Sequence, residues 1–197
     1  MLLTPGPTPV PEFVRKAMAD ITIHHRTEEF EAIFKNTREL LIELYDMPEV
    51  VMLASSGTGA MESCITNLTH KKALTINSGK FGERFGKICA AFGIDYTEIK
   101  NEWNTPVSVE AVVNAIKADP SIDAVFIQIC ESAGGLRHPV EQIAAEIKKI
   151  NKDITIVADG ITAVGVEKID TTNLDAVVTG SQKALMLPPG LAIIGLS

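Results

Sequence analysis

The chain alternates between short apolar runs and longer stretches in which apolar residues recur at helical spacing. The short runs have the length and composition of buried strands and cover residues 50–54, 73–76, 96–99, 124–129, 154–158 and 176–179. The stretches between them have the spacing of amphipathic helices and cover residues 59–68, 81–92, 109–118 and 140–150. This alternation predicts an α/β fold, with a mostly parallel sheet sandwiched by helices on both faces.

Two further helical patterns precede the first apolar run. Thr8 and Pro9 stand where an N-cap and a first helical residue belong, so we expect a helix over residues 9–19. A second helix is expected to begin near Thr27, where glutamates follow in the first turn. Its apolar residues recur at helical spacing, which predicts that it packs on the core: Phe30, Ile33, Phe34, Leu40, Leu41 and Leu44.

Composition and charge narrow the class of function. With 197 residues, 46% of them hydrophobic and 22% charged, the chain has the size and make-up of an ordinary globular domain. A net charge of −7 provides no overall basic field for nucleic acid or an anionic membrane, and no stretch reaches the roughly 20 apolar residues that span a bilayer. We therefore expect small-molecule chemistry in a soluble, cytoplasmic protein with no nucleic acid or membrane partner.

The cysteines indicate neither a disulfide framework nor a metal site. Cys64, Cys89 and Cys130 are odd in number, widely spaced and set within apolar segments, with no C-x-x-C unit beside histidines. We expect them to be buried as small hydrophobic side chains, and we expect no metal.

Polar and glycine residues follow several of the predicted strands. In open α/β sheets, ligands bind beyond the carboxyl ends of the strands, so these positions are the first candidates for a site. The segments are 55–59, 131–135, 159–160 and 180–183. Residues 55–59, Ser-Ser-Gly-Thr-Gly, also open a helix, where backbone N–H groups and hydroxyls can hold a phosphate. The segment fits neither a P-loop nor G-x-G-x-x-G, and a plain glycine turn is the alternative.

Two ionisable residues stand in apolar surroundings at such strand ends. A carboxylate at Asp159, after the apolar run 154–158, is costly unless it finds a partner, such as a backbone turn or a protonated pyridine nitrogen. Lys183 is followed by the apolar residues 184–187, which would depress its pKa and let the neutral amine form a Schiff base with an aldehyde. Taken singly, Lys183 would instead be a solvated surface lysine.

The order of these motifs resembles a known enzyme family. Along the chain stand Ser-Gly-Thr-Gly, Gly-x-Phe-Gly-x-Arg, Glu-Ser-x-Gly-Gly, Ala-Asp-Gly, and Gly-Ser-Gln-Lys-Ala-Leu followed by Pro-Pro-Gly. The opening residues 3–8, and His25-Arg26 followed by Phe30, are similar to the N-terminal signature of the same family. Across nearly the whole chain this order resembles the class V aminotransferases, notably their alanine–glyoxylate and serine–pyruvate branch, which are pyridoxal phosphate (PLP) enzymes of fold type I.

The resemblance implies a role for each motif residue. Lys183 would be the Schiff-base lysine and Asp159 the partner of the pyridine nitrogen, which makes these two the catalytic residues. The other implied contacts are Ser56, Gly57 and Thr58 around the phosphate with Gln182 nearby, Phe81 on the ring face, Ser132 near the ring hydroxyl, and Gly6 at the substrate. The sequence departs from the family at Phe81, where Trp is frequent, and at Ala133-Gly134, where Ser/Thr-Gly is frequent.

The resemblance also implies a domain organisation. Residues 1–25 would form an N-terminal arm and helix, and residues 26–197 the PLP-binding large domain. Family chains continue into a smaller domain that carries the arginine for the substrate carboxylate, whereas this chain stops at Ser197. We therefore expect a chain truncated to the large domain and inactive alone, and a homodimer in the full-length protein.

The activity implied is transfer of an amino group from a small amino acid, such as alanine or serine, to a 2-oxo acid such as glyoxylate or pyruvate. The alternatives are another PLP reaction of this fold, such as desulfurase or lyase chemistry, and a non-catalytic fragment or redox-assembly subunit, because some relatives carry a hydrogenase-subunit label. Desulfurases usually have His where Gln182 stands. A metal hydrolase built on His24, His25 and Asp159 is weaker, since adjacent helical residues do not converge on one face.

Overall fold

The central element is a seven-stranded sheet in the order β1-β9-β8-β7-β4-β2-β3, seen in the computed structural model, which describes residues 2–197. Met1, the first residue of the expected arm, lies outside the described residues. The strands are β1 (Glu49–Ala54), β2 (Lys72–Asn77), β3 (Tyr96–Lys100), β4 (Ile122–Gln128), β7 (Thr155–Asp159), β8 (Ala176–Gly180) and β9 (Leu191–Leu196). β9 pairs antiparallel with β1 and β8, and every other pairing in the sheet is parallel. The predicted mostly parallel sheet is confirmed.

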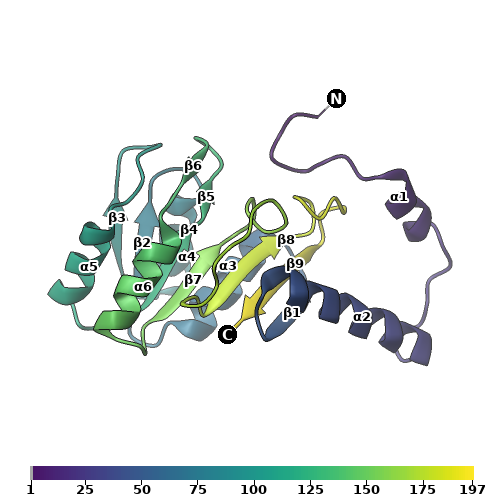
Figure 1. Ribbon diagram of the computed structural model, residues 1–197, viewed down its shortest axis with the longest axis horizontal. Coiled ribbons are helices and arrows are strands. Elements are labelled where there is room, and N and C mark those ends of the chain that lie inside the picture. Colours follow the sequence, from purple (N-terminus) through teal and green to yellow (C-terminus); the bar gives the residue numbers. More distant parts are fainter. Residues whose placement is uncertain (1) are drawn as a thin grey trace.

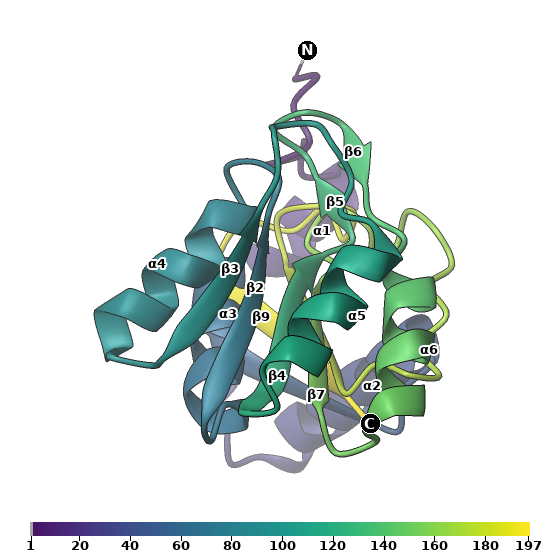
Figure 2. The ribbon, with the colours of Figure 1, turned by 90° about the vertical axis from the view of Figure 1, so that its left-hand side faces the viewer.

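Helices cover both faces of the sheet, as predicted. Figure 2 shows α3 (Gly57–Leu68) and α4 (Gly82–Phe92) on one side, and α5 (Val109–Ala118) and α6 (Val140–Ile150) on the other. Consecutive residues of β4 alternate between the two cores because strand side chains alternate in direction. Phe126 lies 5.4 Å from Phe85 of α4 between ring centroids, whereas Val125 belongs to the cluster that contains α5 and α6.

The helix α2 (Glu28–Tyr45) begins where the sequence predicts, but most of its apolar face does not reach the core. Thr27 is its N-cap, and the Thr27 hydroxyl accepts a hydrogen bond from the Phe30 N–H at 3.3 Å. Leu41 and Tyr45 are the buried residues of the helix. The expectation of core packing is wrong for Ile33, Phe34, Leu40 and Leu44, which are 43% to 58% exposed. The reason is geometric: α2 projects away from the sheet, and its last turns alone meet it (Figure 1).

The first helix, α1 (Glu12–Met18), is shorter than predicted and has a different start. Its N-cap is Pro11, and none of its residues is buried. Thr8 does not cap it: the Thr8 hydroxyl donates to the Lys183 carbonyl at 2.8 Å, and the Thr8 N–H donates to the Gln182 carbonyl at 3.0 Å. The residue before a proline is also driven out of the helical region, which keeps the chain extended up to Pro11. The N-terminal segment is thus tied to the loop that carries Lys183.

A small hairpin of β5 (Cys130–Glu131) and β6 (Leu136–Arg137) follows β4. Strands of two residues are too short to produce a periodic pattern, so the sequence did not predict them. The hairpin matters because it fixes the loop that contains Ser132 at the carboxyl end of β4.

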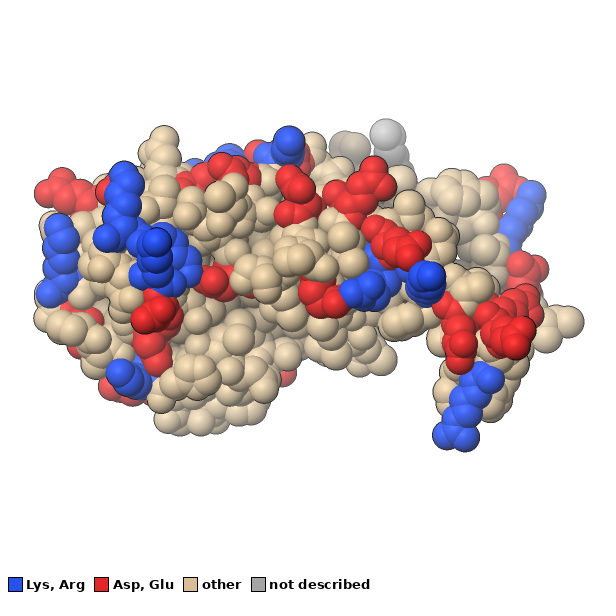
Figure 3. Space-filling model, turned by 60° about the horizontal axis from the view of Figure 1, so that its bottom comes forward, with Lys and Arg blue, Asp and Glu red and all other residues tan. Residues whose placement is uncertain are grey.

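The described surface carries interspersed charges. On the face shown in Figure 3, Lys and Arg side chains lie in small separate groups beside Asp and Glu side chains. Across residues 2–197, no helix combines the length and the apolar character that crossing a membrane requires.

Candidate active site

A pocket of about 100 Å³ lies at the end of the sheet where β1, β7 and β8 finish. Every cofactor contact implied by the sequence lines it. The lining residues are Ser56, Gly57, Thr58, Phe81, Arg84, Cys130, Ser132, Asp159, Ile161, Thr162, Gln182 and Lys183. The remaining predicted residue, Gly6, lies directly against Lys183: a Cβ at Gly6 would come within 2.8 Å of Lys183 Nζ. The structure therefore brings together all the residues to which the family resemblance gives a catalytic, cofactor or substrate role.

One wall of the pocket is the N-terminus of α3. Ser56 is the N-cap, and its hydroxyl accepts a hydrogen bond from the Gly59 N–H at 3.3 Å. Gly57 is buried against Ile161, whose Cγ1 a Cβ at Gly57 would approach to 3.0 Å. Exposed N–H groups and the helix dipole make this end attractive to an anion.

Gln182 borders the same wall and carries an orphaned polar atom. Its Oε1 is buried and has no hydrogen-bond partner within the part of the chain that the structure describes. Buried polar groups in proteins are almost always paired, so this amide is suited to a polar ligand in the pocket.

Asp159 ends β7 inside the pocket and is 4% exposed. Its Oδ1 accepts a hydrogen bond from the Ile161 N–H at 2.9 Å, so the side chain does make the local turn contact that the sequence left open. Burial raises the pKa of Asp159 to about 6; the neighbouring Glu131 also raises it, whereas Arg84 and Lys183 lower it. The group is a buried carboxylate that ionises just below neutral pH.

Lys183 faces Asp159 across the pocket. Burial is the main cause that lowers the pKa of the Lys183 amine, and Arg84 lowers it further, whereas Asp159 raises it. A lowered pKa gives more of the neutral amine, which is the nucleophilic form. The electrostatic setting predicted from the apolar sequence around Lys183 is therefore present.

Glu131 is a site residue that the sequence reasoning missed. It is fully buried, and its Oε2 accepts hydrogen bonds from the N–H groups of Phe81 at 2.8 Å and Gly82 at 2.9 Å. Its Oε1 accepts from Ala133 N–H at 3.2 Å. Glu131 thus fixes the start of α4, which carries Phe81, relative to the loop that carries Ser132. Its place in the Glu-Ser-x-Gly-Gly motif, at the end of an apolar strand, was the available signal.

Arg84 is the second missed residue. Its Nη1 donates to the Thr58 hydroxyl at 2.9 Å, and its guanidinium carbon lies 5.0 Å from the centre of the Phe81 ring. Its signal was the arginine that closes the Gly-x-Phe-Gly-x-Arg motif.

Of the cysteines and histidines considered from the sequence, Cys130 alone lines the pocket. Cys64 and Cys89 are buried as expected, but Cys130 is half-buried and lines the pocket, which corrects its prediction as a core residue. Burial raises the pKa of the Cys130 thiol, with Glu167 also raising it. His24 and His25 lie between α1 and α2, not on a helix, and neither lines the pocket with Asp159. Among residues 2–197, no three His, Cys, Asp or Glu side chains gather to hold a metal ion.

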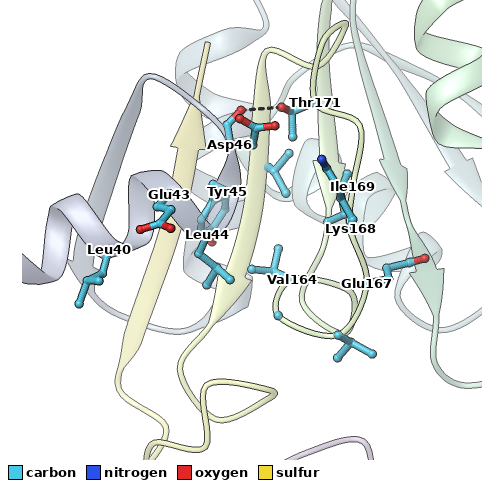
Figure 4. Close-up of a pocket in the computed structure, with 13 residues that line it drawn as sticks. Leu40, Glu43, Leu44, Tyr45, Asp46, Val164, Glu167, Lys168, Ile169 and Thr171 are labelled. Atoms are coloured by element: carbon cyan, nitrogen blue, oxygen red, sulfur yellow. Dashed lines mark hydrogen bonds between the residues drawn. The ribbon is translucent and has the colours of Figure 1, made fainter.

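A larger groove of about 720 Å³ lies between the last turns of α2 and the segment 164–171 (Figure 4). Leu40, Leu44 and Val164 line it, and the Thr171 hydroxyl donates to the Asp46 carbonyl at 2.8 Å across one end. None of the residues to which the sequence assigns chemistry lines this groove. The small pocket is therefore the candidate active site despite its size.

Comparison with known proteins gives a consistent picture. The model of the family described as aminotransferase class-V matches residues 2–197. An uncharacterized aminotransferase from Helicobacter pylori is 50% identical over the whole of this chain, and an L-aspartate–glyoxylate aminotransferase from Paracoccus denitrificans is 31% identical. A protein of Anabaena cylindrica named as the 42 kDa subunit of soluble hydrogenase is 36% identical. The chain covers 52% to 53% of these relatives, so it spans about half their length.

The fold comparison agrees. The crystal structure of an aspartate aminotransferase from Thermus thermophilus matches 99% of this chain and 56% of that chain, with 31% identity and a TM-score of 0.91.

Proposed function

The chain belongs to the class V aminotransferase family, and from this premise we propose that it forms the cofactor-binding part of a PLP-dependent aminotransferase. The observation that carries the proposal is one small pocket lined by an amine, a buried carboxylate and a helix N-terminus: Lys183, Asp159 and the start of α3. These are the groups that the aldehyde, the pyridine nitrogen and the phosphate of PLP would need. Gln182 lines the same pocket, where its amide NH₂ would donate to the phosphate.

Bound PLP would supply an aldehyde and an electron-withdrawing ring that stabilises negative charge at the substrate's α-carbon. Asp159, ionised above about pH 6, would hold the proton on the pyridine nitrogen. Lys183 Nζ would hold the aldehyde end of the group, and once the substrate's amine has displaced it there, the released Lys183 amine would be the base for the α-proton. The backbone and hydroxyls of Ser56, Gly57 and Thr58 would bind the phosphate.

The pocket walls would orient the ring. Phe81 would stack on its face, and the Ser132 hydroxyl would donate to the ring hydroxyl oxygen. Gly6 lies against Lys183, where the Cβ of any other residue would collide with the lysine side chain. The absence of a side chain there would leave room for the substrate. These roles rest on the family resemblance together with the shared pocket.

For the substrates, we propose a small amino acid such as alanine or serine as donor and glyoxylate or pyruvate as acceptor. The Paracoccus relative is named for aspartate and glyoxylate, which supports a 2-oxo acid of this size as the acceptor. For the assembly, we propose a homodimer, supported by the apolar residues exposed on α1 and α2.

The direct test is chemical trapping of the cofactor. The protein is loaded with PLP, reduced with borohydride and digested, and the labelled peptide is identified by mass spectrometry. We expect the label on Lys183, and none in the Lys183→Ala variant at equal PLP. Label on Lys152 or Lys168, or no label in folded protein that binds PLP, would contradict the assignment.

The alternatives are separated by a spectral half-reaction. PLP-loaded protein is mixed with alanine, serine, aspartate or cysteine, and the bound cofactor is followed by absorbance. Conversion to the amine form of the cofactor with release of a 2-oxo acid supports amino transfer, whereas sulfide release or ammonia release indicates desulfurase or lyase activity. Nickel or iron in stoichiometric amounts in the purified protein would support the alternative that the chain is a subunit of a redox assembly.

A further inference from the structure

Arg84 connects two parts of the pocket that come from different helices. It lies on α4, one turn after Phe81, and its guanidinium reaches the Thr58 hydroxyl on the first turn of α3 at 2.9 Å. The same guanidinium lies over the Phe81 ring, 5.0 Å from its centre. A planar guanidinium can donate and stack at once, which an amine on a flexible stem does poorly.

The contact with Thr58 sets the direction of its hydroxyl. Because Arg84 donates to Thr58 Oγ1, the hydroxyl's own proton points elsewhere. Both groups line the pocket, so the Thr58 proton is free to serve an anion at the α3 terminus.

Arg84 also contributes charge. The charged residues that line the pocket are Arg84 from α4, Lys183 after β8 and Asp159 from β7, and Glu131 from β5 lies behind them. Burial raises the pKa of Asp159 and lowers that of Lys183, and Arg84 acts on both in the downward direction. Its positive charge therefore favours the anionic form of Asp159 and the neutral form of Lys183.

We propose that Arg84 is a positioning residue of the cofactor site, which holds the Thr58 hydroxyl and the Phe81 ring in register and whose positive charge favours an anionic Asp159 and a neutral Lys183. Both catalytic groups are needed in these forms, since a protonated carboxyl cannot hold a pyridinium and a protonated amine is no nucleophile. The inference rests on the proposed function, because these forms matter for a ligand with a phosphate, a pyridine ring and an aldehyde.

The first test measures Lys183 in cofactor-free protein, so it does not depend on PLP binding. Trace labelling with acetic anhydride reads the neutral fraction of each amine, and mass spectrometry gives the rate at Lys183 relative to the exposed Lys117. Arg84→Gln should lower the Lys183 rate about threefold or more at pH values below the pKa of the amine, because losing the positive charge of Arg84 reduces the neutral fraction of Lys183. Arg84→Lys keeps the charge and should stay near the wild-type rate.

Lys87→Gln is the matched control, because Lys87 is on the same helix but has a 63% exposed side chain paired with Glu83 at 2.9 Å. It should not change the Lys183 rate. An unchanged rate in Arg84→Gln, or an equal loss in Arg84→Lys, would overturn the charge role.

The second test measures the Kd of PLP by fluorescence. Arg84→Gln and Arg84→Lys should both weaken binding about tenfold or more, because both lose the bond to Thr58 and the planar stack on Phe81. Unchanged affinity in Arg84→Lys would overturn the positioning role, and near-ultraviolet circular dichroism verifies that each variant is folded.

If Arg84→Gln does not fold, Arg84→Lys decides the positioning role, and Arg84→Met replaces Arg84→Gln in the labelling test. Absence of PLP binding by the wild type would overturn the proposed function and the positioning role, but the charge role would still be decided by the labelling of Lys183.

Discussion

Asp159, the proposed partner of the pyridine nitrogen, is buried, and burial makes its charged form unfavourable. Burial raises its pKa from 3.8 to about 6 in the folded, cofactor-free protein. Below the unfolded-state pKa, the group is protonated in both states and nothing is lost. Between the unfolded-state pKa and about pH 6, the unfolded chain releases this proton while the folded protein keeps it, so the free energy of unfolding falls with rising pH and levels off above about 6. Each pKa unit corresponds to about 1.4 kcal/mol, so the loss from this group is about 2–3 kcal/mol by neutral pH.

We therefore predict that Asp159→Asn stabilises the cofactor-free protein by about 2–3 kcal/mol at pH 7.5 and by little at pH 4. The amide keeps an oxygen that can accept the Ile161 N–H bond. Urea unfolding at the two pH values measures the difference, with the exposed Asp153→Asn as control. Equal effects at both pH values would show that ionisation of Asp159 is not responsible. In the full-length protein loaded with PLP, the same variant should lose most of the activity, because an amide cannot hold the pyridinium proton.

Glu131 affects the site through the backbone rather than by contact with the pocket. Its carboxylate accepts three backbone hydrogen bonds, and a glutamine would offer an NH₂ group to one set of these donors. We predict that Glu131→Gln lowers the free energy of unfolding by about 1–3 kcal/mol, the typical cost of unpaired buried donors. Thermal or urea unfolding measures this, and Glu110→Gln on the exposed first turn of α5 is the control. A change below about 0.5 kcal/mol in Glu131→Gln, the size typical of surface substitutions, would mean that Glu131 is not the anchor.

At the scale of the elements, α3 and α5 begin with the same cap but differ in what surrounds it. The Ser56 hydroxyl accepts from Gly59 N–H at 3.3 Å, and the Ser108 hydroxyl accepts from Ala111 N–H at 3.1 Å. Only Ser56 lines the pocket. Comparing variants of Ser56 and Ser108 therefore distinguishes the effect of a helix cap on stability from its effect on ligand binding.

We predict that Ser56→Ala and Ser108→Ala each lower the free energy of unfolding by about 1 kcal/mol. Only Ser56→Ala should also weaken PLP binding, because it removes a hydroxyl from the proposed phosphate site. Urea unfolding and PLP fluorescence titration on both variants give the comparison. Equal PLP affinity in the two would argue against a phosphate at the α3 terminus.

At the scale of the whole molecule, the most unusual feature is the apolar surface of the projecting helices. Phe13, Met18 and Ile21 near α1 are 62% to 94% exposed, and Ile33 and Phe34 on α2 are about half exposed. Exposed apolar patches of this kind mark association surfaces.

We predict that the protein self-associates through this face. The double variant Ile33→Glu with Phe34→Glu should raise the dissociation constant at least about tenfold, because it places charges in an apolar contact. Analytical ultracentrifugation over a concentration series measures it. Trp103→Glu, at a 56% exposed residue outside α1 and α2, is the control. Unchanged association in the double variant would place the interface elsewhere.

The local pattern of the chain was sufficient for most of the elements, but it did not predict the short strands β5 and β6 or the strand β9. The predicted ranges 109–118 and 140–150 coincide with α5 and α6, and Thr27 caps α2 as expected. Periodicity and caps are properties of neighbouring residues, so they can be read without the fold. The expectation failed where a distant partner competed. Thr8 bonds to the backbone of Gln182 and Lys183 instead of capping α1.

The assembly of the pocket was decided by the order of the strands. β9 lies antiparallel between β1 and β8, and β7 follows β8, so the parallel strands β1, β8 and β7 end at the same edge of the sheet. Ser56 follows the first of them, Lys183 the second, and Asp159 ends the third. Motif order along the chain made these residues candidates, but it could not give the bond between Arg84 and Thr58 or the buried contacts of Glu131. Those depend on how helices and loops pack at that edge, which is a property of distances between residues far apart in sequence.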